Sequence, residues 1–209
     1  MTGPIALVAG LGNPGSKYDD TRHNAGFWFL DQVARRDGAT FRGESRFLGD
    51  ATEVRVGGAR VRLLKPTTFM NRSGQSVAAL MRFFKLSPEQ LLVVHDELDL
   101  PPGVVRLKFG GGPGGHNGLK DIIAHVGDRN FHRLRVGIGH PGQRQQVLNY
   151  VLNRPQADEQ KLIDESLDDC LRFFDDMAKG DFERAMNHLH QRKAPPAQAA
   201  ADEPNHESR

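Results

Sequence analysis

Near its start the chain reads Ile5-Ala6-Leu7-Val8-Ala9-Gly10-Leu11-Gly12-Asn13-Pro14-Gly15, a short apolar run followed at once by a glycine-rich loop. The apolar run predicts a buried strand, and the glycines predict a sharp turn or a close approach to a ligand at its carboxyl end. A second pair of this kind occurs where the run Val104–Phe109 precedes six glycines within Gly110–Gly118. Such loops are where α/β folds place their ligands.

The rest of the chain alternates between strand and helix patterns. Short apolar runs predict strands, and apolar residues at helical spacing predict helices between them. This alternation predicts an α/β fold: a single domain with a mixed, largely parallel sheet flanked by helices. The expected strands are 47–56, 60–64, 91–95 and 134–138, and the expected helices are 27–34, 77–84, 119–126, 156–178 and 182–190, with a capped single turn at 87–90.

Composition limits the class of protein. The 209 residues are 38% hydrophobic and 26% charged, which is typical of a globular chain and not of a disordered one. The 28 Lys and Arg against 26 Asp and Glu give a net charge of +2, so any contact with nucleic acid would depend on local patches. The single cysteine, Cys170, excludes a disulfide framework within the chain and a thiolate-rich metal site.

Two segments are expected along the chain. Residues 1–192 carry the alternating patterns and form the expected catalytic domain, whereas 193–209 have no apolar periodicity and are expected to be a disordered polar tail. No apolar run approaches the length of a membrane span, and the first residues lack the charged start of a signal peptide. We therefore expect a soluble, cytoplasmic protein without membrane contact.

The stretch Gly10–Gly15 matches the G-x-G-x-x-G dinucleotide fingerprint, but its context does not fit. The fingerprint needs a helix to open inside the motif, and Pro14 disfavours helix at Asn13. The acid about 20 residues further on, Asp31, lies inside an amphipathic helix rather than at a strand end. The alternative is a loop that carries Asn13 as a ligand group.

Two polar clusters are candidates for catalysis. His23 lies between polar neighbours in Thr21–Gly26, directly after the first glycine loop, and an oriented histidine can take a proton from water near neutral pH. Asp96 follows the most apolar strand, within His95–Asp99, and is the expected partner of a histidine. A metal site at this cluster is the weaker interpretation, because successive strand residues point to opposite faces.

Two further loops carry amide and aromatic side chains. Lys65–Gly74 contains Phe69, Met70 and Asn71, and Gly110–Lys120 contains His116 and Asn117 at the start of a helix whose amides could meet an anion. Each segment also has an interpretation without a ligand, a buried loop for Lys65–Gly74 and a flexible flap for Gly110–Lys120. The sequence has no nucleophile elbow, H-E-x-x-H motif or P-loop. The remaining chemistry is therefore direct attack by water, with histidine as the base. The side-chain amides of Asn13, Asn71 and Asn117 would then bind carbonyl groups.

Five ordered motifs closely resemble the bacterial peptidyl-tRNA hydrolase family over residues 5–191. They are Val8–Tyr18 with Thr21–Phe27, Pro66–Gly74, Val94–Gly103, Gly110–Asp121 and Phe131–Pro141. The resemblance implies hydrolysis of the ester between peptide and tRNA, which recycles tRNA from aborted translation, without metal or other cofactor and by a chain expected to be a monomer.

The resemblance also implies roles for individual residues. His23 would be the general base, Asp96 would orient its ring, and Asn13 would position the 3′ end and the ester. The peptide and the cleft would involve Tyr18, Phe69, Met70, Asn71, His116 and Asn117. The acceptor stem of tRNA would meet Lys108 and Arg135, with Lys120 a neighbour. The rival interpretations are an RNA-binding relative without turnover, a nucleotide-dependent enzyme built on Gly10–Gly15 and a metallohydrolase using His95 and Asp96.

Overall fold

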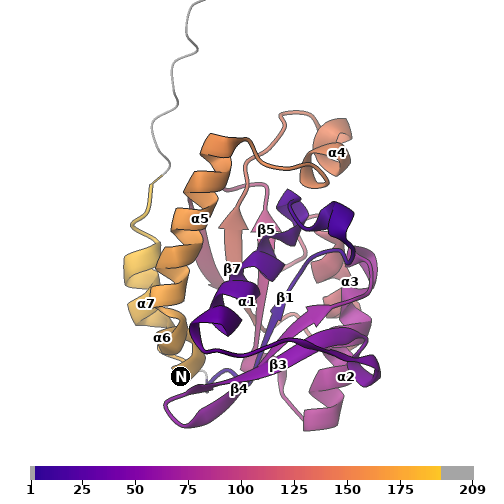
Figure 1. The fold of residues 1–209 in the computed structure, drawn as a ribbon, viewed down its shortest axis with the longest axis vertical. Coiled ribbons are helices and arrows are strands. Elements are labelled where there is room, and N and C mark those ends of the chain that lie inside the picture. Colours follow the sequence, from indigo (N-terminus) through magenta and orange to yellow (C-terminus); the bar gives the residue numbers. More distant parts are fainter. Residues whose placement is uncertain (1–2, 194–209) are drawn as a thin grey trace, which may run out of the picture.

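A seven-stranded sheet runs through the middle of the molecule, between two layers of helices (Figure 1). The structure is a computed structural model that describes residues 3–193. The strands are β1 (Leu7–Gly10), β2 (Arg42–Glu44), β3 (Gly49–Val56), β4 (Ala59–Pro66), β5 (Leu91–Glu97), β6 (Val105–Phe109) and β7 (His132–Gly137). The helices are α1 (Ala25–Arg36), α2 (Ser73–Phe84), α3 (Asn117–Val126), α4 (Val147–Val151), α5 (Ala157–Arg172), α6 (Phe174–Lys179) and α7 (Phe182–Leu189).

The strand order is β2-β3-β4-β1-β5-β7-β6. The four central strands β4, β1, β5 and β7 pair in parallel, and the pairs β2-β3, β3-β4 and β6-β7 at the two sides are antiparallel. This confirms the predicted α/β fold with a mixed sheet. Because the central strands are parallel, the segments after β1, β4 and β5 leave the same edge of the sheet. His23 follows β1, residues 69–71 follow β4, and Asp96 lies near the end of β5.

Both faces of the sheet are covered, which explains why β1 and β5 are apolar without alternation. Val8 of β1 packs into the core beneath α1, α5, α6 and α7, whereas its neighbours Leu7 and Ala9 pack into the core beneath α2 and α3. Figure 1 shows these two groups of helices on opposite sides of the sheet. Cys170 is fully buried in the first core, where burial raises the pKa of its thiol, so it packs as an apolar residue.

Two expected elements differ in the structure. The strand expected from residue 47 begins at Gly49, because Phe47 ends a short turn (Ser45–Phe47) and packs into the core under α2, and Leu48 takes a left-handed conformation with φ 50°. The single helix expected over 156–178 is two helices, α5 and α6. The chain bends at Phe173, and the ring of Phe174 then packs against Phe29 of α1, with 6.2 Å between ring centroids.

Two glycines let α1 approach the sheet closely enough to bring its amino-terminal end to the loop after β1. A Cβ atom at Gly10 would lie 2.4 Å from the carbonyl oxygen of Gly26, and one at Gly26 would lie 2.3 Å from the amide nitrogen of Leu11. Any side chain at either position would push the helix away. The first glycine loop therefore serves this packing, and the segment just before α1, which carries His23, lies beside Asn13.

The described residues also bear on the remaining expectations about organisation. None of the helices between residues 3 and 193 combines the length and the apolar character needed to cross a bilayer. The expected tail 193–209 lies outside the described residues except for Lys193.

Candidate active site

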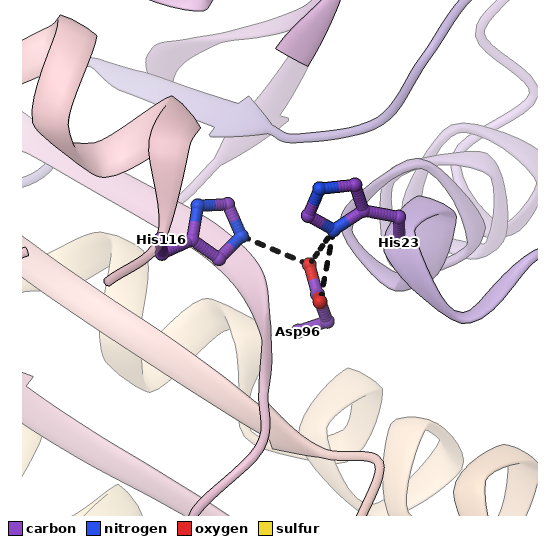
Figure 2. A group of neighbouring side chains, drawn as sticks. All are labelled: His23, Asp96 and His116. Atoms are coloured by element: carbon purple, nitrogen blue, oxygen red, sulfur yellow. Dashed lines mark hydrogen bonds and ion pairs between the residues drawn. The ribbon is translucent and has the colours of Figure 1, made fainter. Parts of the chain in front are cut away.

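Three side chains from distant parts of the sequence meet at the carboxyl edge of the sheet. His23 comes from a short helical turn (Arg22–Asn24) before α1, Asp96 from β5, and His116 from the residue that caps α3. Figure 2 shows both imidazole rings directed at the Asp96 carboxylate. Nδ1 of His23 lies 2.9 and 3.0 Å from the two carboxylate oxygens, and Nε2 of His116 lies 2.9 Å from Oδ1.

The hydrogen bonds of His116 define its tautomer. Its Nδ1 accepts from the backbone amides of Gly118 and Leu119, at 3.2 and 3.3 Å, and so carries no proton. The proton of the neutral ring is therefore on Nε2, which donates to Asp96. His116 thus acts as a cap for α3 and as a hydrogen-bond donor to the carboxylate, and this arrangement leaves it no free nitrogen with which to take a proton.

The orientation of His23 is complementary. Asp96 is acceptor-only when ionised, so Nδ1 of His23 donates to it and the neutral ring keeps an unprotonated Nε2. In Figure 2 this second nitrogen faces away from Asp96. A neutral imidazole held in one tautomer by a carboxylate, with its other nitrogen free, has the geometry of a general base.

The electrostatics of the pair agree with this geometry. Burial alone would lower the pKa of His23, but the charge of Asp96 and its hydrogen bond raise the pKa above its usual value. Burial would raise the pKa of Asp96, but His23 and His116 hold it well below its usual range. Asp96 is only 3% exposed and is ionised at neutral pH because two donors point at it.

The same three residues are close enough to be considered as metal ligands, since one atom from each lies within 4.8 Å of the others. The donor chemistry does not fit a cation in this arrangement. Nε2 of His116 keeps its proton as long as Nδ1 caps α3, and a metal ligand must present an unprotonated nitrogen. Binding of a metal ion here would therefore require breaking the cap of α3.

His95 precedes Asp96 in β5 and takes no part in the pair. Its Nδ1 donates to the backbone carbonyl of Asp96 at 2.7 Å, and burial lowers its pKa to about 3, so the ring stays neutral at physiological pH. Its Nε2 is buried without a hydrogen-bond partner among the described residues. A metallohydrolase that uses His95 together with Asp96 has no support in this geometry, because the two side chains do not converge on a common point.

Asn13 is buried beside the pair and is held rigidly. Its backbone exchanges two hydrogen bonds with the side chain of Asn24, at 2.8 and 3.0 Å, and its Oδ1 accepts from the amide of Met70 at 2.8 Å. The carboxamide orientation is thus defined, and Nδ2 remains without a hydrogen bond to the described residues. Asn13 can therefore offer one preoriented donor to a ligand.

Of the other predicted cleft residues, His116 and Asn117 line the cavity at His23, whereas Tyr18, Phe69, Met70 and Asn71 are not among its lining residues. Met70 is buried, whereas Phe69 is 57% exposed and packs edge-on against Tyr18, with 6.4 Å between ring centroids. Asn71 and Asn117 are exposed. The cavity lined by His23 and Asp96 has a volume of about 390 Å³. Four predicted residues line this cavity: His23, Asp96, His116 and Asn117. The other lining residues are Glu97, Leu98, Pro113, Gly114, Gly115, Arg144, Val147, Leu148 and Val151.

The predicted phosphate contacts lie on the edge strand β6, on its neighbour β7 and on α3. Lys108 and Lys120 are exposed, whereas Arg135 is partly buried and its Nε donates to Glu97 at 2.9 Å. Lys108 on β6 and Arg135 on β7 point to the same face of the sheet, since Lys108 pairs with Arg133 two residues from Arg135. Arg135 is therefore already paired with a carboxylate in this structure.

Sequence reasoning missed three buried polar residues that support the site. Asn24 holds Asn13, as described above, and Arg133 contacts the second glycine-rich loop. Arg22 donates to three backbone carbonyls of residues 150–154 and to Glu159 at 2.6 Å, and so ties the turn that carries His23 to the segment between α4 and α5. The only signal in the sequence was that Arg22 and Asn24 flank His23, because their partners lie far along the chain.

The fold and the site together define a class of protein. An oriented imidazole, a buried carboxylate and a fixed amide donor at the carboxyl edge of an α/β sheet are parts that hydrolytic enzymes use.

The chain belongs to the peptidyl-tRNA hydrolase family, whose model matches residues 7–197. It is 54% identical to the peptidyl-tRNA hydrolase of Azoarcus sp. (strain BH72), over 98% of this chain and 97% of that one. It is also 54% identical to that of Erwinia tasmaniensis, over 91% and 98%. The crystal structure of peptidyl-tRNA hydrolase from Acinetobacter baumannii superposes with a TM-score of 0.88 at 49% identity, covering 90% of this chain and 96% of that one.

Proposed function

We propose that this chain hydrolyses the ester bond between peptide and tRNA in peptidyl-tRNA, with His23 as the general base. Membership of the family supports the reaction and the substrate. The single observation that supports the mechanism is the hydrogen bond from Nδ1 of His23 to Asp96, which leaves Nε2 as the only basic nitrogen of the His23–Asp96–His116 group. The product, free tRNA, returns to translation.

The reaction needs one water and no further reactant. The water oxygen attacks the ester carbonyl carbon while Nε2 of His23 takes a proton from it, and Asp96 stabilises the imidazolium that forms. The tetrahedral intermediate then collapses, the bond between the carbonyl carbon and the ribose 3′ oxygen breaks, and His23 returns the proton to that oxygen. Asn13 would donate from Nδ2 to the substrate, and Asn71 and Asn117 would bind the peptide part.

Release of peptide from N-acylated aminoacyl-tRNA, with and without a chelator, tests this proposal. We expect release that persists in the chelator, because the donor set at His23, Asp96 and His116 does not fit a metal ligand role. Release that stops in the chelator and returns with a divalent cation at constant tRNA folding would favour the metallohydrolase. Tight binding of tRNA without turnover would make the chain an RNA-binding relative.

We expect Asn13→Asp to lower kcat by about 10²–10³, the cost typical of losing one donor to a developing oxyanion. The new carboxylate can still accept from the amide of Met70, but its charge is buried, so the thermal midpoint should fall as well and kcat is measured well below that midpoint. The carboxylate cannot donate a hydrogen bond, and its charge repels the negative charge that develops on the carbonyl oxygen of the ester. Steady-state kinetics with Asn187→Asp, an exposed site on α7, as the control would show this, and unchanged kcat would remove Asn13 from the mechanism.

The tRNA would bind on the side of Lys108, Arg135 and Lys120. Lysine and arginine position phosphate groups without reading sequence, which suits an enzyme that must accept many tRNAs. We infer that the acceptor stem lies over the β6–β7 side of the sheet and that its 3′ end reaches Asn13. The assignment of residues 1–192 as the catalytic domain, a cytoplasmic location and a monomeric state complete the proposal.

Lys108→Ala is expected to raise KM for peptidyl-tRNA and to leave kcat near the wild-type value. It should also reduce the slope of log Kd for tRNA against log salt concentration by about one, since one phosphate contact is lost. Filter-binding titrations at several salt concentrations measure this slope. Lys179→Ala, which removes an exposed lysine at the end of α6, is the control and should keep the wild-type slope. Equal slopes for all three proteins would mean that Lys108 only contributes to solubility.

A further inference from the structure

The glycine-rich segment Gly110–Gly115 precedes the two residues His116 and Asn117, but it has little conformational preference of its own. Four of its glycines adopt positive φ angles: 67° and 101° at Gly110 and Gly111, and 57° and 82° at Gly114 and Gly115. Glycine visits many conformations in the absence of other constraints. The conformation of this segment must therefore be imposed by contacts from outside it.

The main contact comes from Arg133 in the middle of β7. Its side chain lies beneath the segment and is 3% exposed. Nη1 donates to the carbonyl of Gly112 at 2.6 Å, and Nη2 donates to the carbonyl of Gly111. The guanidinium also lies over the ring of Phe131, 4.7 Å from its centroid, and the amide of Gly110 donates to the carbonyl of Phe131 at 2.9 Å.

The contacts continue from this anchor to the catalytic pair. After Gly112 the chain turns once, with the amide of His116 donating to the carbonyl of Pro113 at 2.9 Å, and His116 then caps α3 and donates to Asp96. Asn117 follows and lines the cavity beside His23. A displacement of the segment at Gly111 and Gly112 would therefore move the donor of one hydrogen bond to Asp96.

We propose that Arg133 is a positioning residue for catalysis, which holds Gly110–Gly115 so that His116 donates to Asp96 and Asn117 faces the cavity. The inference rests on the proposed function of the site. Burying a guanidinium is costly unless its donors are used, and an apolar side chain would fill a strand position in a core more cheaply. Arg133 directs two of its donors at the backbone of the loop, while its Nε is buried without a hydrogen-bond partner among the described residues, an arrangement that a residue present only to stabilise the fold would not need.

Arg133 also lies next to the predicted tRNA contact. Lys108 is its neighbour across the β6–β7 ladder, and a Cβ atom at Gly111 would lie 2.8 Å from Nζ of Lys108. The same glycine thus contacts the arginine through its carbonyl and the lysine at its Cα. The end of a lysine side chain can move at little cost, so Lys108 does not fix the loop, and the anchor of the loop is Arg133.

Arg133→Lys tests the proposal, because it keeps the charge and loses the two-pronged donor geometry. We expect kcat to fall by roughly 10- to 100-fold, the cost of a misplacement of about 1 Å in an active site, while KM stays within about twofold. Arg62→Lys is the matched control, since Arg62 also lies over a phenylalanine ring, that of Phe84 at 3.7 Å, but is far from the loop. It should keep wild-type kcat.

Two readouts separate positioning from general destabilisation. If His116 leaves Asp96, the carboxylate bonds to His23 alone, so the acid limb of the kcat–pH profile should move to higher pH in Arg133→Lys and likewise in His116→Ala. A merely less stable protein would lose activity at all pH values with the limb in place. The second readout needs no activity: ring ¹⁵N shifts of His116 report protonation on Nε2 in the wild type, and this state should be lost in Arg133→Lys.

Arg133→Ala with added guanidinium ion provides a second variant in case the first perturbs folding. We expect kcat to recover with increasing guanidinium at concentrations far below those that unfold the protein, and methylammonium to have no such effect. The proposal is overturned by wild-type kcat in Arg133→Lys, or by a loss of kcat with an unmoved acid limb and an unchanged His116 tautomer. Failure of the wild type to hydrolyse peptidyl-tRNA would instead refute the proposed function and leave the tautomer measurement valid.

Discussion

Replacing His23 by alanine is expected to lower kcat for peptide release by about 10²–10⁴, the contribution typical of a positioned general base. The physical reason is that Nε2 of His23 is the only basic nitrogen the His23–Asp96–His116 group offers. His116 uses both ring nitrogens in hydrogen bonds, and His95 directs its Nδ1 proton at the backbone and has its Nε2 buried. No neighbouring histidine can therefore substitute for His23 without rearrangement of β5 or α3.

The variant should still fold and still bind tRNA. His23 contributes nothing to the core, and the predicted phosphate contacts lie on other elements. Single-turnover peptide release, with circular dichroism and a tRNA titration beside it, checks all three statements. His188→Ala removes an exposed histidine of α7 and should behave as the wild type. Turnover in the His23 variant within threefold of wild type would mean that another group activates the water.

Sequence could predict the members of the site but not their division of roles. His23 and Asp96 are 73 positions apart, and it was the resemblance to the family that implied their pairing. The fold brings them together because parallel strands have their carboxyl ends at one edge of the sheet. The role of His116 depends on where the amides of Gly118 and Leu119 point, and a helix cap formed by a histidine ring has no clear signal in a sequence.

The supporting arginines were harder to predict, for a related reason. Arg133-Leu134-Arg135-Val136 alternates charged and apolar residues, which is typical of a strand with one face in solvent. In the structure Arg133 is buried on that nominally polar face, because the Gly110–Gly115 segment folds back over β7 and supplies two carbonyl acceptors. The covering loop lies about twenty residues away, so local periodicity could not reveal it.

The second large effect is expected for Asp96→Asn, which should lower kcat by roughly 10²–10⁴ and change the pH dependence of what remains. An amide in this position can accept only through its one oxygen, while His23 and His116 both donate. If its nitrogen faces His23, the imidazole must take the other tautomer, and Nε2 then carries the proton and cannot act as a base. The amide also lacks the charge that stabilises the imidazolium.

The direction of the pH change follows from the causes of the pKa shift in His23. In the wild type Asp96 raises this pKa against the effect of burial, so the base is neutral, and active, only above a pH higher than the usual value of about 6.5. Asp96→Asn removes both raising causes and leaves burial, which lowers the pKa. The acid limb of kcat should therefore move below that of the wild type, whereas Arg133→Lys should move it above.

The stability of the variant should differ from the wild type most at mildly acidic pH. The raised pKa of His23 contributes stability that is fully present below its unfolded value and is lost as the pH rises through the folded one. The lowered pKa of Asp96 contributes stability that is present above its unfolded value and is lost as the pH falls through the folded one.

Both contributions are present between about pH 4 and pH 6.5. Thermal midpoints of wild type and Asp96→Asn should thus be furthest apart in this window and should move closer, without meeting, as the pH rises through the raised pKa of His23. A difference that grows steadily with pH would show that the His23–Asp96 pair is not charged in the folded protein.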